Sequence, residues 1–554
     1  MGKPAKGRAL LLAIMSIVMI AGGAFMTLSQ GAVAQDAKVL RIHQVTFPDI
    51  ADPQRSSFTS EIAILALNYE GLTRQDNDLN TVPAAAESWE FNEDLTQVTF
   101  HLREGLMYSD GSPLTAERFR YAAERTCDPK TAGQYPSILF DIVGCADFNG
   151  VDPADTAAYD AAKAALGVSA PDDRTLVVNL VAPAPYFPTV ASLWVFYPAK
   201  QELIEQGGEA WWKDPALQIG NGVFQMSSFD DTLQIGFVAN ENYWGGRALL
   251  DGIEYVYQGE ASIAIEAFRA GDLDIVDVDA AQIPVVTADP DLSDNVVQYA
   301  VASTYTLSFN LTMAPFDDIK VREAFSKAFD RETYCSVIRN GDCTPTLSWI
   351  PVGLPGSIES DLYGFDPEGA VAALAESSYG GADALPPITL YFNSNDTANT
   401  ARAEWVAGQY REILGIEITL APTEGTALTA LRKDSTTFPQ MLLVGGWIQD
   451  YPDPQNWLSV YWKCDTTFAQ RVGYCNEEID AILTQADQLA DPAERMPLYQ
   501  QAGEMLVNDI PSPFLYNGSQ TSLIADGVTG FTATPLDAEW PGQFTSLLTI
   551  DKTS

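Results

Sequence analysis

The sequence predicts a mixed α/β protein with more than one domain. Its 554 residues exceed what a single hydrophobic core usually supports. Short apolar runs with strand character alternate along the chain with helical patterns. The clearest case is a βαβ unit, in which strands at Ile388–Phe392 and Ile416–Leu420 flank a helix at about Ala401–Leu414. These features together predict the α/β class.

Residues 1–34 are typical of a secretory signal peptide. Lys3, Lys6 and Arg8 precede an apolar run from Ala9 to about Met26, and Ala32-Val33-Ala34 offers a small-x-small cleavage point. The alternative is a retained membrane anchor, but the run is near the lower length limit for a spanning helix and the small-residue exit favours cleavage. Because no cysteine lies near the cleavage point, we expect a soluble, exported, periplasmic protein without a lipid anchor.

The N-terminal half alternates predicted strands and helices. In the segment Val98–Arg103, apolar residues alternate with polar ones, which is the pattern of a half-buried strand. Thr115 is expected to cap the helix that follows. In chain order, the expected elements are a strand at Val39–His43, a helix from Ile62 to Glu70 ended by Gly71, a strand pair entered at Pro83–Trp89 that includes Val98–Arg103, a helix after Thr115, a helix at Asp155–Leu166, a strand at Thr175–Leu180 and a strand after the glycine turn at Ile219–Val223.

The C-terminal half carries strong helix-start signals. Asp366-Pro367-Glu368 and Asp491-Pro492-Ala493-Glu494 each place a capping carboxylate before a proline at the first helical position. Asp317 or Asp318 can cap a helix whose apolar side chains, from Val321 to Phe329, share one face.

The charge of the chain excludes one class of partner. The formal net charge is -43, from 74 acidic and 31 basic residues. Such a surface repels phosphates, so we expect no nucleic-acid partner. The apolar content of 46% is too high for a disordered acidic chain, so the charge is read as a solvated surface on a folded protein.

The cysteines indicate an oxidising compartment. An even count with local spacing is compatible with disulfides, although the sequence alone does not fix the connectivity. A metal site is the competing interpretation, but there is no Cys-x-x-Cys pair, and the only histidines are His43 and His101, so no metal is expected. The three neighbouring pairs are Cys127 with Cys145, Cys335 with Cys343, and Cys464 with Cys475.

No catalytic motif is present. The chain has neither a G-x-S-x-G nor an H-E-x-x-H segment, and two histidines leave few possible bases for a nucleophilic site. The glycines at Ile219–Val223 match neither a phosphate loop nor a dinucleotide fingerprint, so no cofactor is expected. Paired carboxylates are plentiful, so a secreted glycoside hydrolase stays open as an alternative class.

The segment Gly445–Pro454 combines unusual features. It follows Met441–Val444, which is typical of a short buried strand. Two glycines allow a close backbone approach. The aromatic Trp447 and the carboxylate of Asp450 follow, before a proline-rich exit. The arrangement suits a wall with a stacking platform and one fixed negative charge, although by itself it is also compatible with a packed loop.

Several segments together resemble one family, the extracytoplasmic solute-binding proteins of ABC importers in the dipeptide/oligopeptide-binding group (family 5). The order and spacing of the segments carry this resemblance, which extends over nearly the whole chain after residue 34. The matching segments are Tyr69-Glu70-Gly71-Leu72, Ala86-Glu87-Ser88-Trp89, Val98–Arg103 with Ser109–Ala116, Asn240-Glu241-Asn242-Tyr243-Trp244, Phe268–Asp274, Pro315–Arg322, Ala328-Phe329-Asp330-Arg331 and Gly445–Pro454.

The resemblance implies a periplasmic-binding-protein-like fold of type II, cluster C, with two α/β lobes around a cleft and a small inserted domain. Domain I would be discontinuous, the small domain II would be inserted into it, and domain III would close against it over the ligand. The implied boundaries are 35–79, 199–301 and 514–554 for domain I, 80–198 for domain II and 302–513 for domain III.

The resemblance also implies how a peptide would bind. Adding the peptide as a strand to protein edges would satisfy its backbone groups without reading its side chains. Gly445 and Gly446 would offer one edge, and Ser57, Phe58 and Thr59 would offer the other. The family's amine-binding aspartate falls on Asp450, within Trp447-x-x-Asp450-Tyr451. The alternative interpretation is that Asp450 only caps a turn.

Other implied site residues have a second interpretation. Arg432 or Lys433 would pair with the peptide carboxylate, or be a surface charge on a helix. Tyr135, Tyr305 and Tyr516 fall near cleft positions, although tyrosines of this kind often belong to the core. The sequence departs from peptide binders of this group at Gly425, where they can carry tryptophan, and at Val444, where they can carry arginine, so the cleft is expected to be roomier or tuned to another ligand.

The resemblance therefore implies a non-catalytic, monomeric receptor that captures a peptide-like solute and delivers it to ABC permease subunits with their ATPases. No metal or cofactor is expected. An oligosaccharide ligand is the alternative on the same fold, favoured by Trp447 and by the absence of a basic residue at position 444. The secreted hydrolase is the remaining alternative.

Overall fold

A single large sheet organises most of the chain. The structure is a computed structural model that describes residues 37–45, 47–394, 398–432, 435–536 and 547–553; the predicted signal peptide and Lys433 lie outside these ranges. Eleven strands form the sheet. Its strand order is β15 (Ile418–Thr423), β14 (Ile388–Asn393), β16 (Met441–Ile448), β12 (Val296–Phe309), β17 (Phe514–Ile524), β11 (Ile275–Asp277), β1 (Val39–Gln44), β10 (Gly252–Tyr257), β9 (Gln234–Ala239) and β8 (Phe224–Asp230), with β13 (Cys343–Pro345) paired to β17.

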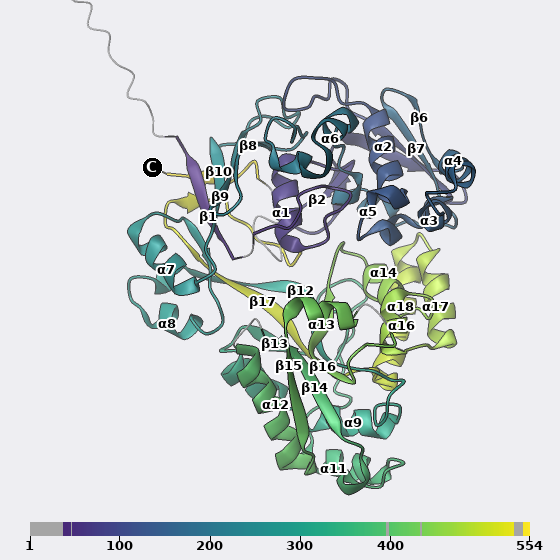
Figure 1. The fold of residues 1–554 in the computed structure, drawn as a ribbon, viewed down its shortest axis with the longest axis vertical. Coiled ribbons are helices and arrows are strands. Elements are labelled where there is room, and N and C mark those ends of the chain that lie inside the picture. Colours follow the sequence, from purple (N-terminus) through teal and green to yellow (C-terminus); the bar gives the residue numbers. More distant parts are fainter. Residues whose placement is uncertain (1–36, 46, 395–397, 433–434, 537–546, 554) are drawn as a thin grey trace, which may run out of the picture. The chain divides into compact units, whose positions relative to one another are not determined.

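The long strands β12 and β17 connect the two ends of this sheet. They pair antiparallel with each other, and β12 also pairs with β16 while β17 also pairs with β11. In Figure 1 they run from the region of β1 and β10 to the region of β14 and β16. Because these strands continue from one region into the other, residues 38–554 form one compact unit.

A second sheet is built from β4 (Ala86–Phe91), β5 (Gln97–Leu102), β7 (Thr175–Asn179) and β6 (Val168–Asp172), in that order and antiparallel. The alternation predicted for Val98–Arg103 is confirmed, since Val98, Phe100 and Leu102 are buried in β5. The remaining strands form two small pairs, β2 (Thr73–Gln75) with β3 (Thr81–Pro83), and β18 (Val528–Thr529) with β19 (Asp551–Lys552).

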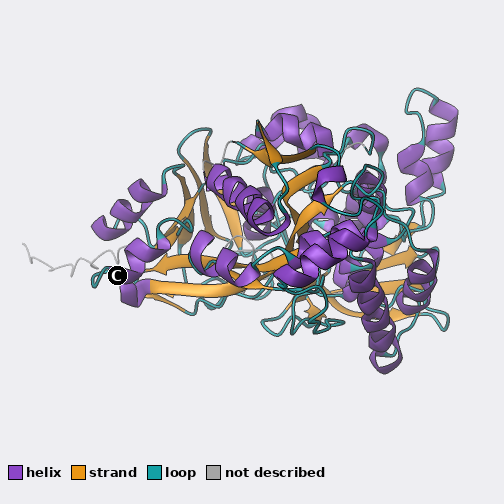
Figure 2. Cartoon of the chain, turned by 90° about the horizontal axis from the view of Figure 1, so that it is seen from below, coloured by secondary structure: helices purple, strands orange, loops and turns teal. Residues whose placement is uncertain are grey.

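Helices are interspersed with the strands along the chain rather than segregated, as the α/β prediction requires. Figure 2 shows that helices also surround the strands in space. They are α1 (Thr59–Asn68), α2 (Ala116–Cys127), α3 (Cys145–Gly150), α4 (Thr156–Ala164), α5 (Phe187–Val190), α6 (Gln201–Gly207), α7 (Ala261–Ala270), α8 (Ile283–Ala288), α9 (Ile319–Lys327), α10 (Arg331–Thr333), α11 (Pro367–Glu376), α12 (Ala398–Leu414), α13 (Gly425–Arg432), α14 (Pro454–Trp457), α15 (Ser459–Trp462), α16 (Thr467–Val472), α17 (Glu477–Asp487) and α18 (Pro492–Asp509).

Most predicted helix starts are confirmed at the level of the cap. The carboxylates of Asp155, Asp318, Asp366 and Asp491 each accept a hydrogen bond from a backbone N–H in the first turn. Thr115 occupies the cap position of α2, but its side chain makes no capping hydrogen bond. The βαβ prediction is confirmed, because β14 and β15 are parallel neighbours joined through α12.

Two elements differ from the sequence expectation. Helix α1 begins at Thr59 rather than Ile62, because the Glu61 carboxylate reaches back to accept hydrogen bonds from the N–H groups of Ser57 and Phe58. Strand β16 continues through both glycines to Ile448 instead of ending at Val444. All three predicted disulfide pairs are confirmed: Cys127–Cys145, Cys335–Cys343 and Cys464–Cys475.

Candidate ligand-binding site

Strand β16 has one edge that carries no partner strand over its second half. Along one side it pairs with β12 from Met441 to Ile448. On the other side it pairs with β14 only at Met441 and Leu442. From Gly445 to Ile448 this second edge therefore pairs with no other strand of the described ranges. An open edge of this kind is a template for an added strand.

The two glycines of β16 are required by its contact with β12. A Cβ atom on Gly445 would lie 1.8 Å from the hydroxyl oxygen of Ser308, and one on Gly446 would lie 2.1 Å from the carbonyl oxygen of Thr304. Gly446 also has φ +147°, a conformation that favours glycine. The close backbone approach predicted for this pair is thus directed at β12, and the opposite edge of β16 has no partner strand at these glycines.

Asp450 follows this edge directly and is held by Asn456. The Asn456 side-chain amide donates a hydrogen bond to the Asp450 carboxylate at 3.0 Å, and its oxygen accepts one from the Asp450 backbone N–H at 3.0 Å. Desolvation raises the pKa of the Asp450 carboxyl to about 7, and the hydrogen bond from Asn456 offsets only part of this rise. A cationic group placed beside this carboxyl would favour its charged form.

Trp447 and Tyr451 form a buried wall rather than an exposed stacking platform. The Trp447 side chain is only 7% exposed, and its indole N–H donates to Asn456 at 2.9 Å. Its ring packs edge-on against Tyr461 and Phe468, with centroid distances of 5.4 and 4.9 Å. The Tyr451 hydroxyl is buried and donates to Gln455. The expectation that Trp447 offers a stacking face is therefore wrong.

Tyr135 approaches this site from the N-terminal part of the chain. It is half-buried and packs against Trp194 with a centroid distance of 5.5 Å. Burial raises the pKa of Tyr135, the charge of Asp450 raises it further, and the charge of Arg471 lowers it. Tyr135 therefore lies within electrostatic reach of both Asp450 and Arg471.

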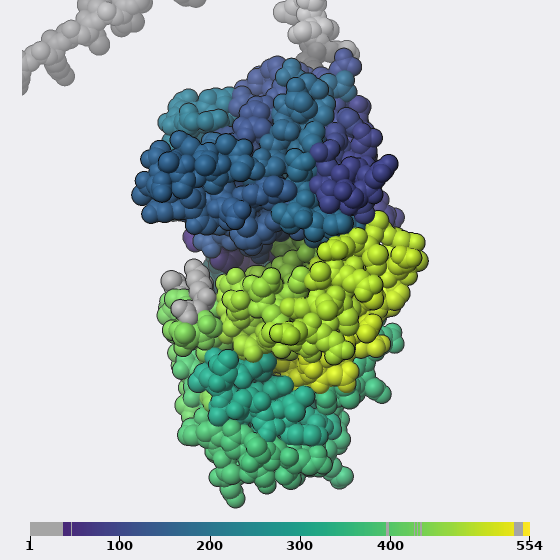
Figure 3. Space-filling model, turned by 90° about the vertical axis from the view of Figure 1, so that its right-hand side faces the viewer, coloured from purple at the N-terminus to yellow at the C-terminus, as the bar shows by residue number. Residues whose placement is uncertain are grey.

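Two further contacts join the N-terminal part of the chain, which supplies Tyr186, to the C-terminal part, which supplies Gln455 and Arg495. The Gln455 side-chain amide donates to the Tyr186 hydroxyl at 3.3 Å, and the guanidinium of Arg495 lies 5.4 Å from the centre of the Tyr186 ring. Tyr186 in turn donates to Asp141 at 3.0 Å. Figure 3 shows a furrow between the blue surface, which includes the β4–β7 sheet, and the yellow-green surface, which includes α14 to α18.

A cavity of about 1080 Å³ opens beside α1 and α12. Phe58 and Thr59 line it, and the Phe58 side chain is 60% exposed. The N–H groups of Ser57 and Phe58 already donate to Glu61, so in this structure they do not present donors to a ligand strand. Arg339 and Arg402 also line this cavity.

The remaining predicted residues are divided between core and surface. Tyr516 is buried and stacks on the half-buried Tyr305 with a centroid distance of 4.9 Å, so this pair belongs to the packing between β12 and β17. Arg432 is half-buried at the end of α13, and its charge acts on Tyr461, which also packs against Trp447.

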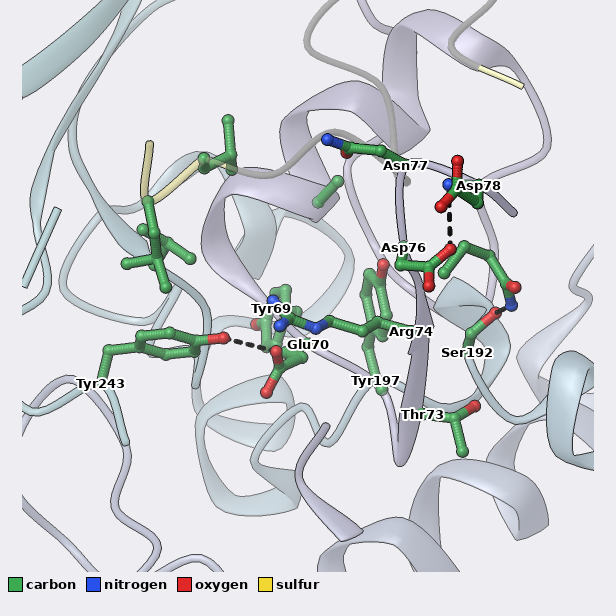
Figure 4. A pocket seen from close by; sticks show the side chains of 16 residues that line it. Tyr69, Glu70, Thr73, Arg74, Asp76, Asn77, Asp78, Ser192, Tyr197 and Tyr243 are labelled. Atoms are coloured by element: carbon green, nitrogen blue, oxygen red, sulfur yellow. Dashed lines mark hydrogen bonds between the residues drawn. The ribbon is translucent and has the colours of Figure 1, made fainter. Parts of the chain in front are cut away.

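A smaller cavity of about 340 Å³ lies elsewhere, around Glu70. The Glu70 carboxylate accepts hydrogen bonds from the Tyr243 hydroxyl and the Trp244 indole. Figure 4 shows Tyr243 directed at Glu70 and Arg74 reaching toward the same carboxylate. Burial raises the pKa of Glu70. These contacts join two of the segments that carry the family resemblance, which gives both segments a structural role.

Within the described ranges there is no group of three or more histidine, cysteine, aspartate or glutamate side chains placed to hold a metal ion. His101 faces Glu90 at 3.5 Å, and His43 is buried against the Gln258 carbonyl at 2.7 Å. In these described ranges, no helix has the length and apolar character needed to cross a bilayer.

Sequence reasoning missed four contributors to the site. Asn456 is fully buried and binds both Trp447 and Asp450, and its position just inside the Asp453-Pro454 helix start was a usable signal. Tyr461 and Phe468 complete the aromatic wall, but no motif marks them. Arg471 likewise has no sequence signal, because its role depends on which side chains surround it.

Comparisons with known proteins show the family of this chain. The model of the bacterial extracellular solute-binding proteins, family 5, matches residues 80–469. The chain is 30% identical to the probable deoxycholate-binding periplasmic protein YgiS of Escherichia coli over 89% of this chain and 90% of the relative. It is 27% identical to the dipeptide-binding protein DppE of Bacillus subtilis over 91% of each.

Solved structures share the fold. The murein tripeptide-binding protein MppA of Escherichia coli matches with a TM-score of 0.78 at 24% identity, covering 94% of this chain and 99% of MppA. A complex of Haemophilus influenzae OppA with RPPGFSPFR matches with a TM-score of 0.77 at 24% identity. The match covers 94% of this chain and 100% of the OppA chain. The expected type II periplasmic-binding-protein fold is thereby confirmed. This chain belongs to the bacterial extracellular solute-binding proteins of family 5.

Proposed function

We propose that the protein captures a peptide as an added strand on β16, with the peptide amine bound to Asp450. The observation that carries this proposal is the position of a desolvated carboxyl, with a pKa of about 7, at the end of an open strand edge. The edge supplies backbone groups for a peptide of any sequence, and Asp450 supplies the one charge that every peptide amine requires.

Desolvation explains why the pairing stabilises the complex. A buried peptide group without a partner costs roughly 1–3 kcal/mol, so a ligand that pairs along Gly445–Ile448 avoids this cost for several groups. An ammonium beside Asp450 favours the ionised carboxylate, which the free protein holds at an unfavourable pKa. Both contributions are independent of the peptide side chains.

The descriptions of the relatives support a role as a peptide receptor of an ABC importer. DppE and the OppA proteins are described as dipeptide- and oligopeptide-binding, and MppA as binding a murein peptide. In this proposal the chain is an exported, periplasmic, monomeric, non-catalytic receptor that delivers its ligand to an ABC permease and its ATPases. Domain II at 80–198 would contain the β4–β7 sheet, domain III at 302–513 would contain β14 to β16, and the ligand would lie between domains I and III. Ligand-induced closure would be the signal for docking.

A second candidate ligand is an amphipathic carboxylate such as a bile acid. The relative YgiS is described as probably deoxycholate-binding. The cavity beside α1 exposes apolar side chains, with Phe58 60% and Val45 54% exposed, and Arg339 and Arg402 also line it. The oligosaccharide alternative loses its main support because Trp447 is buried.

Calorimetric titration of the wild-type protein and of Asp450→Asn tests the proposal, with trialanine and deoxycholate as probes. Trialanine is expected to bind the wild type and to lose at least about tenfold in affinity in Asp450→Asn, or about 1.4 kcal/mol. Deoxycholate affinity, if present, is expected to stay the same or to rise, because a negative charge is removed. Binding of deoxycholate but not of trialanine would overturn the peptide assignment in favour of the second candidate.

A further inference from the structure

Tyr186 contacts a part of the chain to which its own part is not joined by any sheet. In the described ranges, no strand of residues 80–198 pairs with a strand of residues 302–513. Tyr186 precedes α5 in the first of these segments. Its hydroxyl accepts a hydrogen bond from the Gln455 amide at 3.3 Å, and the guanidinium of Arg495 lies 5.4 Å from the centre of its ring. These side-chain contacts can break and re-form without disturbing either sheet.

The direction of the Tyr186 hydroxyl is set within its own segment. It donates a hydrogen bond to the Asp141 carboxylate at 3.0 Å. Asp141 is held beside the same strand end, because its carbonyl accepts from the Val181 N–H at 2.8 Å. Since the hydroxyl proton is committed to Asp141, the oxygen can only accept from the other segment, and the Gln455 amide is a suitable donor.

The partners of Tyr186 are also ordered within their own segment. The side-chain oxygen of Gln455 accepts from the Tyr451 hydroxyl, which leaves the NH₂ group for Tyr186. Arg495 forms an ion pair with Asp453, which keeps its planar guanidinium in place against the Tyr186 ring. Because both sides are arranged before they meet, the contact costs little side-chain entropy.

The short helix α14 joins this contact to the proposed amine site. Gln455 donates to Tyr186, and the next residue, Asn456, donates to the Asp450 carboxylate. The charge of Lys463, from the same segment as α14, also lowers the pKa of Asp141, which burial raises. Figure 3 shows the two segments facing each other across the furrow. Residues 80–198 and 302–513 therefore meet beside Asp450.

The chemistry of the contact favours one that opens. A hydroxyl, an amide and a guanidinium are all readily hydrated when the two surfaces separate, unlike the apolar side chains of a core. Surfaces between domains that move relative to each other are more polar than permanent ones. A hydrogen bond of this kind shifts an equilibrium by about fivefold, so it biases closure without making it irreversible.

We propose that Tyr186 is a latch, whose contacts with Gln455 and Arg495 hold residues 80–198 against residues 302–513 in the ligand-free protein. The inference goes beyond the proposed function, because it applies to any ligand that binds beside Asp450. It gives the inserted segment a role in closure. A latch that forms before the ligand arrives slows both the entry and the exit of the ligand.

Small-angle X-ray scattering of the ligand-free protein tests the latch without any ligand. In the double variant Tyr186→Ala/Gln455→Glu the ring contact and the amide donor are removed, while an oxygen remains for Tyr451. Its radius of gyration is expected to exceed that of the wild type. Tyr410→Phe is the control, because the Tyr410 hydroxyl donates to the Phe325 carbonyl inside one segment, and it should scatter like the wild type.

Stopped-flow tryptophan fluorescence with trialanine tests the kinetic role. Tyr186→Phe keeps the ring and removes the hydroxyl. Its dissociation rate is expected to rise about fivefold. Its association rate is expected to rise as well, so the affinity changes less than either rate. Tyr410→Phe should leave both rates unchanged.

Two results would overturn the inference. One is an equal radius of gyration for the wild type and the double variant, both shown to be folded by cooperative thermal unfolding. The other is a loss of affinity in Tyr186→Phe at an unchanged dissociation rate, which would make Tyr186 a ligand contact instead. If trialanine binds to no variant, the proposed peptide function fails, while the scattering comparison still decides whether the latch exists.

Discussion

Asn456 binds Asp450 from two directions. Its side-chain NH₂ donates to the carboxylate, and its oxygen accepts the Asp450 backbone N–H as well as the indole N–H of Trp447. Asn456 is fully buried at 0% exposed area, on the short helix α14 that Asp453 caps. The direction of the Asp450 carboxylate is therefore set by a residue six positions later in the chain.

Replacing Asn456 by alanine is expected to weaken both folding and binding. The backbone N–H of Asp450 and the indole N–H of Trp447 would each lose an acceptor, at roughly 1–3 kcal/mol for each buried group. Urea unfolding should show a loss of about 2–6 kcal/mol, and trialanine affinity should fall because the carboxylate is no longer oriented. A variant with unchanged stability would mean that water or another group replaces the amide.

Peptide binding is expected to weaken as the pH falls below 7. The free protein holds the Asp450 carboxyl with a pKa of about 7, and a bound ammonium lowers that pKa, so binding and proton release are coupled. The affinity should fall by up to tenfold per pH unit below 7, while the amine itself stays protonated. Titrations at pH 7.5, 6.5 and 5.5 check this slope.

The matched control for this pH dependence is Asp450→Asn. This variant is expected to bind more weakly, and its affinity should stay constant over the same pH range, because the neutral amide does not titrate. A steep profile in the variant would assign the coupled proton to another group, such as Asp487, whose pKa is raised to about 6.

Sequence patterns correctly predicted the features that depend on residues close together in the chain. The caps at Asp366 and Asp491 depend only on the next few residues, and both appear as expected. Asp450 was singled out through its place in a resemblance that covers most of the chain, and its amine-binding role stays a prediction. The disulfides followed from short spacings. In each of these cases the partners lie close together in sequence.

The sequence did not reveal which side chains are buried by distant partners. Trp447 packs against Tyr461 and Phe468 and is buried. The pattern Trp447-x-x-Asp450 does not indicate this burial. The sequence also did not reveal that Glu61 accepts hydrogen bonds from the N–H groups of Ser57 and Phe58. Arg471 was overlooked because an unpaired charge is recognised only when its surroundings are known.

The two glycines of β16 are expected to differ in tolerance to alanine. A Cβ on Gly445 would meet the Ser308 hydroxyl at 1.8 Å, which is a side-chain atom, whereas a Cβ on Gly446 would meet the Thr304 backbone carbonyl at 2.1 Å. Gly446→Ala should therefore be the more destabilising change, since its φ of +147° adds backbone strain. Ser308→Gly should partly rescue Gly445→Ala, as measured by the unfolding midpoint, and should not rescue Gly446→Ala. Rescue of both would show that the clash at Gly446 relaxes by a strand shift.

The stability of the protein is expected to fall as the pH rises from 4 to 6, in part through Asp487. Burial raises the pKa of this carboxyl to about 6, although Tyr499 and Ser459 donate hydrogen bonds to it at 2.6 and 2.7 Å. An unfolded aspartate titrates near 3.9, so between these values the folded protein holds a proton that the unfolded chain does not. The contribution of Asp487 to stability is therefore greatest below pH 4, decreases through pH 6 and is constant above it, with a loss of up to about 3 kcal/mol.

Asp487→Asn isolates this contribution. The amide keeps an oxygen in the place that accepts from Ser459 and Tyr499, and it does not titrate. The pKa of Asp342 is also raised to about 6, so this residue changes the stability of both proteins over the same pH range. The difference in stability between wild type and variant therefore reports Asp487 alone. Urea unfolding at pH 4 and pH 7.5 should show the variant gaining up to about 3 kcal/mol relative to the wild type at the higher pH. A constant difference between the two proteins at both pH values would mean that Asp487 is ionised in the folded state throughout, and that its hydrogen bonds outweigh its burial.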